Sequence, residues 1–168
     1  MKNLLATAGA VAVLALTSTP AFAVTPTTQA KATAKIFKPL TIASTQNLDF
    51  GTIVLAGAAF SGESVAMDTS GVVTCGTTAG DLTCSGAPVP ATYHLAGTAN
   101  AVVTITSPAF NLTNGAATLP FAPNFAGTVT LDSTGAADIS LGGTISNLAN
   151  TTTDGVYTGN FAVTADYQ

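Results

Sequence analysis

The two cysteines, Cys75 and Cys84, are the side chains with the clearest chemistry in this sequence. The short stretch between them, 76–83, is rich in Gly and Thr and predicts the tip of a β-hairpin. No second cluster of metal-ligating side chains accompanies the cysteines, so the pattern does not favour a metal or redox site. We expect a structural disulfide, which for so short a loop stabilises a fold by roughly 2–3 kcal/mol at most.

The remaining ionisable side chains show no catalytic arrangement. His94 is the only histidine, it lies in a predicted strand, and the sequence offers it no partners for a catalytic triad. The acidic residues occur singly in predicted turns, without the spacing of a calcium-binding loop. We therefore expect no enzymatic activity, no bound metal and no cofactor.

The first residues, 1–23, have the pattern of a secretory signal peptide. Lys2 precedes a short apolar run, and Ala21-Phe22-Ala23 matches the A-x-A cleavage site. The run is shorter than the roughly 20 residues of a membrane-spanning helix, and no later stretch is comparably apolar. We expect cleavage after Ala23, no transmembrane segment in the mature chain, and an oxidising compartment in which the cysteine pair forms.

Basic residues are too few for a protein that binds nucleic acid. The formal net charge is −4, and the only bases after the predicted leader are Lys31, Lys35 and Lys38. Hydrophobic residues make up 47% of the chain, which does not fit intrinsic disorder. The composition therefore excludes nucleic acid as a partner and favours a folded, secreted domain.

Turn signals separate short apolar segments along the mature chain, and no window shows helical periodicity. This spacing is typical of an all-β sandwich or barrel, and the length fits one immunoglobulin-like domain with an additional arm. Two prolines make 119–125 an edge segment or a crossing between sheets. Turns are predicted at 44–47, 68–71, 114–115 and 132–135, and strands at 40–42, 48–54, 64–67, 72–75, 92–95, 102–106, 128–131 and 137–145.

The end of the chain, 155–168, alternates between apolar and polar side chains. This pattern predicts one strand with a buried and a solvent-facing side. Chain termini fray unless a sheet holds them, so this strand must pair with a neighbour in its own chain or in another. Its large apolar positions are Tyr157, Phe161, Val163 and Tyr167.

A second alternating segment lies at 29–36, near the other end of the mature chain. Its apolar face carries Ala30, Ala32, Ala34 and Ile36, whereas its polar face is basic. A proline then interrupts the pattern. Three interpretations remain open: the first strand of a complete sandwich, a disordered tail, or an arm that adds as a strand to the acidic body of another copy.

The two ends together resemble a known family. The segments 141–144 and 155–167, with the penultimate Tyr167, are similar to the closing part of chaperone–usher pilus subunits of the archaic, spore-coat-U-like branch. They are also similar to a related family of secreted bacterial proteins known only as a domain of unknown function. The segments 32–42 and 48–53 resemble the N-terminal run of that second family.

This resemblance implies an immunoglobulin-like β-sandwich at 37–168 that lacks its last strand, preceded by a donor-strand arm at 24–36. The final strand would then have two partners, its own sheet on one edge and a strand from elsewhere on the other. The residues that match the donor strand are Ala30, Ala32, Ala34 and Ile36. The residues that match the acceptor groove and the chaperone contact are Gly155, Tyr157, Phe161, Val163 and Tyr167.

The partners that the resemblance implies are a periplasmic chaperone, an outer-membrane usher and neighbouring copies in a head-to-tail polymer. The protein would be secreted through the periplasm of a bacterium and form part of a fimbrium at the cell surface. The alternative is a self-contained secreted β-sandwich that binds a carbohydrate or a matrix ligand as a monomer.

Overall fold

The computed structural model describes residues 25–168, so the predicted signal peptide, 1–23, lies outside the described residues. The described residues form twelve strands and no helix, which confirms the all-β prediction. The chain divides into two units, Met1–Lys35 and Ile36–Gln168, and all twelve strands belong to the second.

The strands are short, with the exception of β11. Each of the eight strands predicted between residues 40 and 145 overlaps a strand of the structure, although the one predicted at 48–54 begins only at Thr52. The strands at Leu82–Ser85 and Phe110–Asn114 were not predicted. The bounds of all twelve strands are β1 Thr41–Gln46, β2 Thr52–Leu55, β3 Glu63–Met67, β4 Val73–Cys75, β5 Leu82–Ser85, β6 Ala91–Ala96, β7 Val102–Thr106, β8 Phe110–Asn114, β9 Ala117–Asn124, β10 Thr128–Thr130, β11 Ala136–Leu148 and β12 Thr164–Tyr167.

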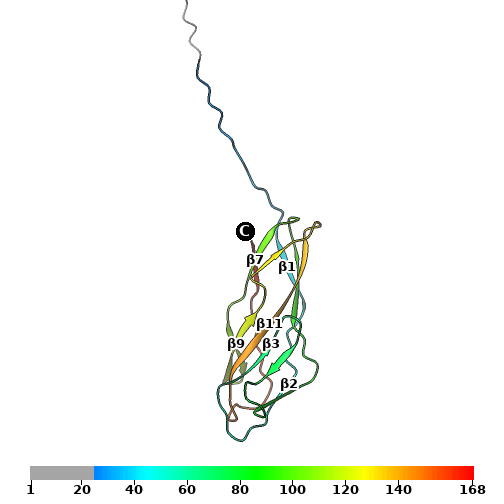
Figure 1. Cartoon of the computed structure of the whole chain (residues 1–168), viewed down its shortest axis with the longest axis vertical. Helices are drawn as coiled ribbons and strands as arrows, with labels where there is room; N and C mark the ends of the chain where they lie inside the picture. The colour runs from blue at the N-terminus through cyan, green and yellow to red at the C-terminus, as the bar shows by residue number, and fades with distance from the viewer. Residues whose placement is uncertain (1–24) are drawn as a thin grey trace, which may run out of the picture. The chain divides into compact units, whose positions relative to one another are not determined.

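One seven-stranded sheet is organised around β11 (Figure 1). The first half of β11 pairs with β6, which also pairs with β1, and its second half pairs with β3 and β9. Gly142 and Gly143 lie where the partners change. The Met67 carbonyl occupies the space that a Cβ at Gly142 would need, and the Phe121 ring does the same at Gly143. These two glycines therefore allow β3 and β9 to approach β11 closely.

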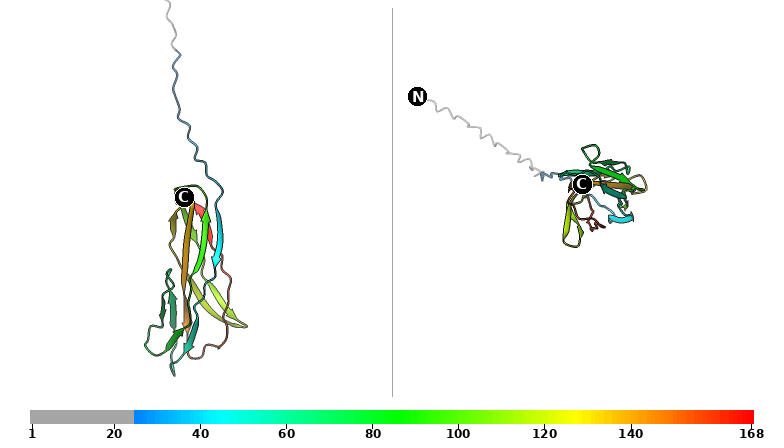
Figure 2. Two further views of the ribbon diagram at one scale, coloured as in Figure 1. Left: turned by 90° about the vertical axis from the view of Figure 1, so that its right-hand side faces the viewer. Right: turned by 90° about the horizontal axis from the view of Figure 1, so that it is seen from below.

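The remaining strands form a three-stranded sheet, β10-β7-β12, and a two-stranded ribbon, β2-β5. All pairings are antiparallel. The sheets curl to give a sandwich-like fold (Figure 2). Two apolar clusters result. The closed cluster consists of Leu95, Val103, Ile105, Leu131 and Ile139. The open cluster consists of Val65, Leu82, Leu119, Phe121, Ile145 and Leu148.

Two turns share one sequence pattern and one structure. The turn 68–71 links β3 to β4, and the turn 132–135 links β10 to β11. In each turn the Asp Oδ1 accepts the backbone N–H groups of the second and the fourth following residue, at 2.8–3.0 Å. Gly71 and Gly135 have φ values of 87° and 89°, which glycine adopts without strain. Both predicted turns are therefore confirmed.

Three predicted elements differ from the structure because strand pairing is a tertiary property. The predicted polar turn at 44–47 is wrong, since 44–46 extend β1 and pair with β6. There, Thr45 and Thr92 join their hydroxyls at 2.7 Å. The predicted hairpin around 76–83 is also wrong, because β4 pairs with β3 and β5 pairs with β2. Segment 119–125 lies mainly in β9, which passes from pairing with β8 to pairing with β11.

The two alternating segments at the chain ends also form less strand than predicted. The predicted strand at 155–168 is wrong in extent, since only Thr164–Tyr167 forms β12 and only Thr158 makes an isolated bridge before it. Segment 29–36 forms no strand in the described chain. An alternating pattern makes a segment suitable for a sheet, but a strand forms only where a neighbour supplies backbone hydrogen bonds.

Candidate strand-binding groove

A groove of about 1130 Å³ reaches the open cluster from the surface. One wall is formed by residues 47–55, which include β2, and the other by residues 152–161, which precede β12. Side chains of β8, β9 and β11 form the floor between them, so the groove continues the apolar core outward. The floor side chains are Phe110, Leu112, Leu119, Phe121, Ile145 and Leu148.

Four phenylalanines form a continuous aromatic cluster in the groove. The ring centroids of Phe110 and Phe121 are 4.9 Å apart, and those of Phe110 and Phe161 are 5.4 Å apart in a stacked arrangement. Phe50 meets Phe121 edge to face at 6.0 Å. Since these rings come from both walls and from the floor, they join the walls into one apolar surface.

The wall at 152–161 and its continuation leave part of the backbone without partners. Thr158 exchanges two backbone hydrogen bonds with Thr113 of β8, at 2.8 and 3.0 Å, and β12 begins at Thr164. Among the described residues, the intervening segment 159–163 makes no backbone–backbone hydrogen bond. Unpaired N–H and C=O groups beside an apolar groove are the groups that an added β-strand satisfies.

The rim of the groove combines exposed apolar and acidic side chains. Val54 on one wall is 47% exposed, and Val156 on the other is 80% exposed. Asp49 and Asp154 are the only charged side chains among the described residues that line the groove. This surface therefore suits a partner that presents apolar groups to the floor and basic groups to the rim.

Two glycines determine the course of the 152–161 wall. Gly155 has a φ of 131° and lies against the amide of Asn114, which donates to the Asp154 carbonyl at 2.9 Å. Gly159 passes over the ring of Phe110, where a Cβ would clash with the ring edge. A larger residue at either position would push the wall away from the floor.

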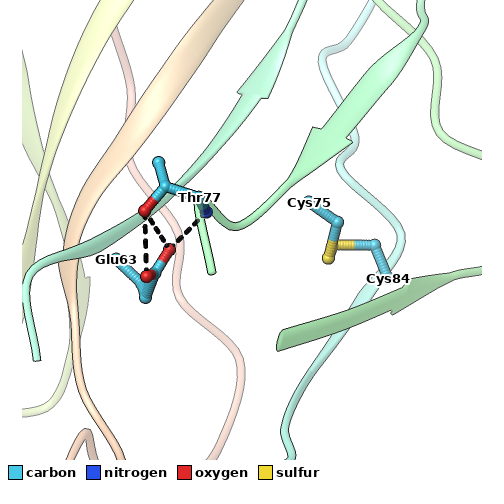
Figure 3. Close-up of a disulfide and its surroundings, with 4 residues drawn as sticks. All are labelled: Glu63, Cys75, Thr77 and Cys84. Carbon is cyan, nitrogen blue, oxygen red and sulfur yellow. Dashed lines mark hydrogen bonds between the residues drawn. A yellow bond between two sulfur atoms is a disulfide. The ribbon is translucent and has the colours of Figure 1, made fainter. Parts of the chain in front are cut away.

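The opposite wall is tied to the rest of the fold by the disulfide (Figure 3). Cys75 in β4 and Cys84 in β5 are bonded, with Cα atoms 5.8 Å apart. Cys84 pairs in register with Ile53 of β2, on the groove wall. Within the described chain β5 pairs only with β2, so the disulfide links the β2–β5 ribbon covalently to the large sheet. The predicted disulfide is present, and it supports a groove wall rather than a hairpin tip.

A buried carboxylate anchors the loop that follows Cys75. Glu63, at the start of β3, is 4% exposed, and its Oε2 accepts the backbone N–H of Thr77 at 2.5 Å. The Thr77 hydroxyl lies 2.9 Å from both carboxylate oxygens (Figure 3). The backbone hydrogen bond from Thr77 is the main cause that lowers the pKa of Glu63 below its ordinary value. The ionised Glu63 thus holds the loop next to the disulfide.

The structure places the predicted groove residues in two regions. Gly155, Tyr157 and Phe161 line the groove. Val163 and Tyr167 instead pack against the closed cluster. A single alternation over 155–168 does not distinguish these regions, because both clusters lie on the same side of the segment.

The groove residues that the sequence did not identify are those of the floor and of the 47–55 wall. Phe110 and Phe121 lie on different strands and meet because the register of the β8–β9 hairpin pairs them directly. The available local signal was the alternation that buries Leu119 and Phe121 on one face of β9. That signal marks core positions and does not show that the core is open.

Outside the groove, the ionisable side chains of the described residues include one pair of histidine and aspartate. No group of three or more His, Cys, Asp or Glu side chains in this part of the chain could hold a metal ion. His94 and Asp138 form an exposed cross-strand pair between β6 and β11, with Nδ1 2.6 Å from Oδ1. Within residues 25–168 there is no helix of the length and apolar character needed to cross a membrane.

The fold and the groove define the protein as an all-β, sandwich-like domain with an open apolar groove. The family described as a domain of unknown function (DUF4402) matches residues 40–167, so the chain belongs to this family. No curated protein and no solved structure matches the chain. Membership in a family of unknown function agrees with one part of the resemblance, whereas the similarity to pilus subunits stays a prediction.

Proposed function

We propose that this protein is a pilin-like structural subunit of an extracellular surface fibre that is assembled by donor-strand complementation. The observation that carries the proposal is the apolar groove whose wall continues into the unpaired backbone of 159–163. In this proposal the arm of one copy adds as a strand in the groove of the next copy. A contact of this kind does not close on itself, so it gives a head-to-tail polymer.

The arm has the features that such a groove requires. Segment 29–36 presents small alanines and Ile36 on one face, so its backbone can approach the floor closely. Its other face carries Lys31 and Lys35, which complement the two acidic side chains of the rim. Exposed ion pairs contribute little affinity, but complementary charge accelerates association and suppresses wrong partners.

The same groove supports the proposal of a chaperone partner. An open apolar groove with exposed valines on its rim favours aggregation unless another surface covers it. We propose that a periplasmic chaperone covers it until an outer-membrane usher brings two subunits together at the surface of the bacterial cell. The fibre then replaces the chaperone contact with the arm of a neighbouring copy.

Deletion of the arm, residues 24–36, tests the proposal. The shortened chain should fold and be secreted with the chaperone but form no polymer, as measured by size-exclusion chromatography and electron microscopy. A synthetic peptide of residues 24–36 should bind the shortened chain and raise its thermal stability. Fibres formed by the shortened chain would contradict the proposal.

Two substitutions in the full chain provide a matched pair. Ala32→Asp places a charge on the face that enters the groove, whereas Thr33→Asp places the same charge on the outer face. Only Ala32→Asp should abolish the polymer, because burying an unpaired carboxylate in the groove costs roughly 3 kcal/mol or more. The alternative function, a monomeric carbohydrate- or matrix-binding sandwich, predicts that the wild-type chain is a stable monomer and that neither substitution matters.

A further inference from the structure

The last tyrosine of the chain holds the residue at which the arm joins the domain. Phe37 and Tyr167 stack with ring centroids 4.4 Å apart and 9° between the ring planes. The C-terminus lies at the same end of the second unit as the start of β1 (Figure 2). Ile36, which precedes Phe37, is 89% exposed. The chain is therefore fixed at Phe37 and leaves the domain surface at Ile36.

Hydrogen bonds reinforce this contact. The Tyr167 hydroxyl donates to the Lys38 carbonyl at 2.9 Å and accepts the backbone N–H of Thr98 at 2.7 Å. The Lys38 N–H donates to Thr98 Oγ1 at 2.6 Å. A Cβ at Gly97 would overlap the Tyr167 hydroxyl, so glycine is required there to make room for it. One hydroxyl thus connects the start of the domain to the loop after β6.

We infer that the contacts of Tyr167 with Phe37 and Lys38, called the clasp below, fix the junction between the arm and the domain, which is the root of the arm. Successive subunits of the fibre are then coupled without a flexible spacer. The coupling rests on the proposed function, whereas the clasp does not. With Ile36 as the last donor residue in a neighbouring groove, no residue remains between that groove and the clasped Phe37. An extended residue spans only about 3.3–3.6 Å, so the two domains must meet directly. The surface around Tyr167 then abuts the groove mouth of the next copy.

The clasp can be tested without assembly, on the dilute, secreted full-length chain isolated as a monomer. Trypsin cuts after lysine and arginine, so its sites in the secreted chain are confined to the arm and its root. Cleavage after Lys31 reports on the arm itself, whereas cleavage after Lys35 requires the adjacent clasp to open. The bases of the sequence are Lys2, Lys31, Lys35 and Lys38, and Pro39 blocks cleavage after the last of them.

The measured quantity is the ratio of cleavage after Lys35 to cleavage after Lys31. Tyr167→Ala should raise this ratio about tenfold because it removes the stacked ring and both hydrogen bonds, and Tyr167→Phe should raise it about threefold. Tyr157→Phe is the matched control, because it removes a hydroxyl that donates to Thr153 in the groove wall. It should leave the ratio unchanged.

An unchanged ratio in a folded Tyr167 variant would overturn the clasp. Tyr167→Phe keeps the ring in place, so the test remains valid if Tyr167→Ala does not fold. A rise of the same size in Tyr157→Phe would also overturn it, since the effect would then reflect general loosening of the domain.

The coupling can be tested on assembled fibres. Insertion of Gly-Ser-Gly-Ser between Ile36 and Phe37 keeps every donor and groove residue and adds a flexible spacer. Fibres should still form, with a persistence length in electron micrographs that is reduced at least about threefold. Unchanged stiffness would overturn the coupling and leave the proposed function intact. Absence of fibres from the wild-type chain would contradict the proposed function, while the cleavage ratio would still test the clasp.

Discussion

The closed cluster and the open cluster are built from the same kinds of side chains, but they differ in how the protein surface covers them. In the closed cluster Leu95 is fully buried, and β12 packs Tyr167 against it from the last strand of the chain. In the open cluster Val65 and Phe121 are buried equally well, but the groove reaches Phe121 between two walls. Both clusters are therefore true cores, and the groove reaches buried side chains of only the open one.

A single segment accounts for the difference. Residues 164–167 pair with β7 and seal the closed cluster, whereas 159–163, directly before them, have no backbone partner in the described chain. The open end is thus a core beside an unpaired stretch of backbone, which is where the proposed donor strand would add. Changes in the fully buried side chains of the closed cluster should affect folding alone, and changes in the groove should also affect what the groove binds.

Replacement of Leu95 should have the largest effect on folding. Leu95→Ala leaves a cavity in the closed cluster and should lower the free energy of unfolding by about 2–5 kcal/mol. Urea denaturation measures this loss, which should be the same with and without a bound peptide of residues 24–36. A loss that vanished when the peptide was bound would remove the distinction between the clusters.

Removal of the disulfide should have the next largest effect. Replacing Cys75 and Cys84 together by serine should lower the free energy of unfolding by about 2–3 kcal/mol, because a short closed loop is released. Since Cys84 pairs with Ile53 on the groove wall, the affinity for the arm peptide should fall as well. Calorimetric titration checks this, with Leu95→Ala as the control that loses stability without losing affinity.

Phe161 and Val163 lie in one short segment but contact different clusters, so their variants allow the two clusters to be compared. Both side chains are half-buried, but Phe161 lies in the groove and Val163 packs on the closed cluster. Each alanine variant should lower the free energy of unfolding by about 1 kcal/mol. Only Phe161→Ala should weaken binding of the arm peptide, by about tenfold or more. Equal affinities in the two variants would argue against the groove as the binding site.

Local signals account for what the sequence predicted well. The strand predicted at 102–106 coincides with β7, and the one at 64–67 falls within β3, because alternation and flanking turn residues define both. The turns beginning at Asp68 and Asp132 follow from a carboxylate that bonds to its own backbone and a glycine that adopts positive φ. No distant residue is needed to form these elements.

The pairing of the strands and the opening of one cluster to a groove depend on residues that are far apart in the sequence. These two features could not be predicted from the sequence. The stretch between Cys75 and Cys84 has the composition of a hairpin tip, yet its flanking strands pair with other partners in two different sheets. Phe110 and Phe161 meet only after the β8–β9 hairpin is packed against the final segment. The sequence pattern marks both rings as apolar, but only the fold shows that they face a groove.

The two Asp turns provide the finest comparison, because the same structure occurs next to each cluster. The backbone N–H of Ala136 is the main cause that lowers the pKa of Asp132 from 3.8 to about 2. The pKa of Asp68 is lowered as well, chiefly by the Ser70 hydroxyl. Because each folded-state pKa lies below its unfolded value, the contribution to stability is complete above the ordinary pKa. It is lost as the pH falls from about 4 toward 2.

Asp132→Asn retains an oxygen acceptor for the turn but does not titrate. Its melting temperature should therefore fall less than that of the wild type between pH 4 and pH 2.5, as measured by thermal unfolding. Asp68→Asn should show the same change, because the Asp68 carboxylate accepts hydrogen bonds from its own turn in the same way and its pKa is lowered too. A melting temperature that fell with pH as steeply in both variants as in the wild type would contradict a contribution of these two carboxylates to stability.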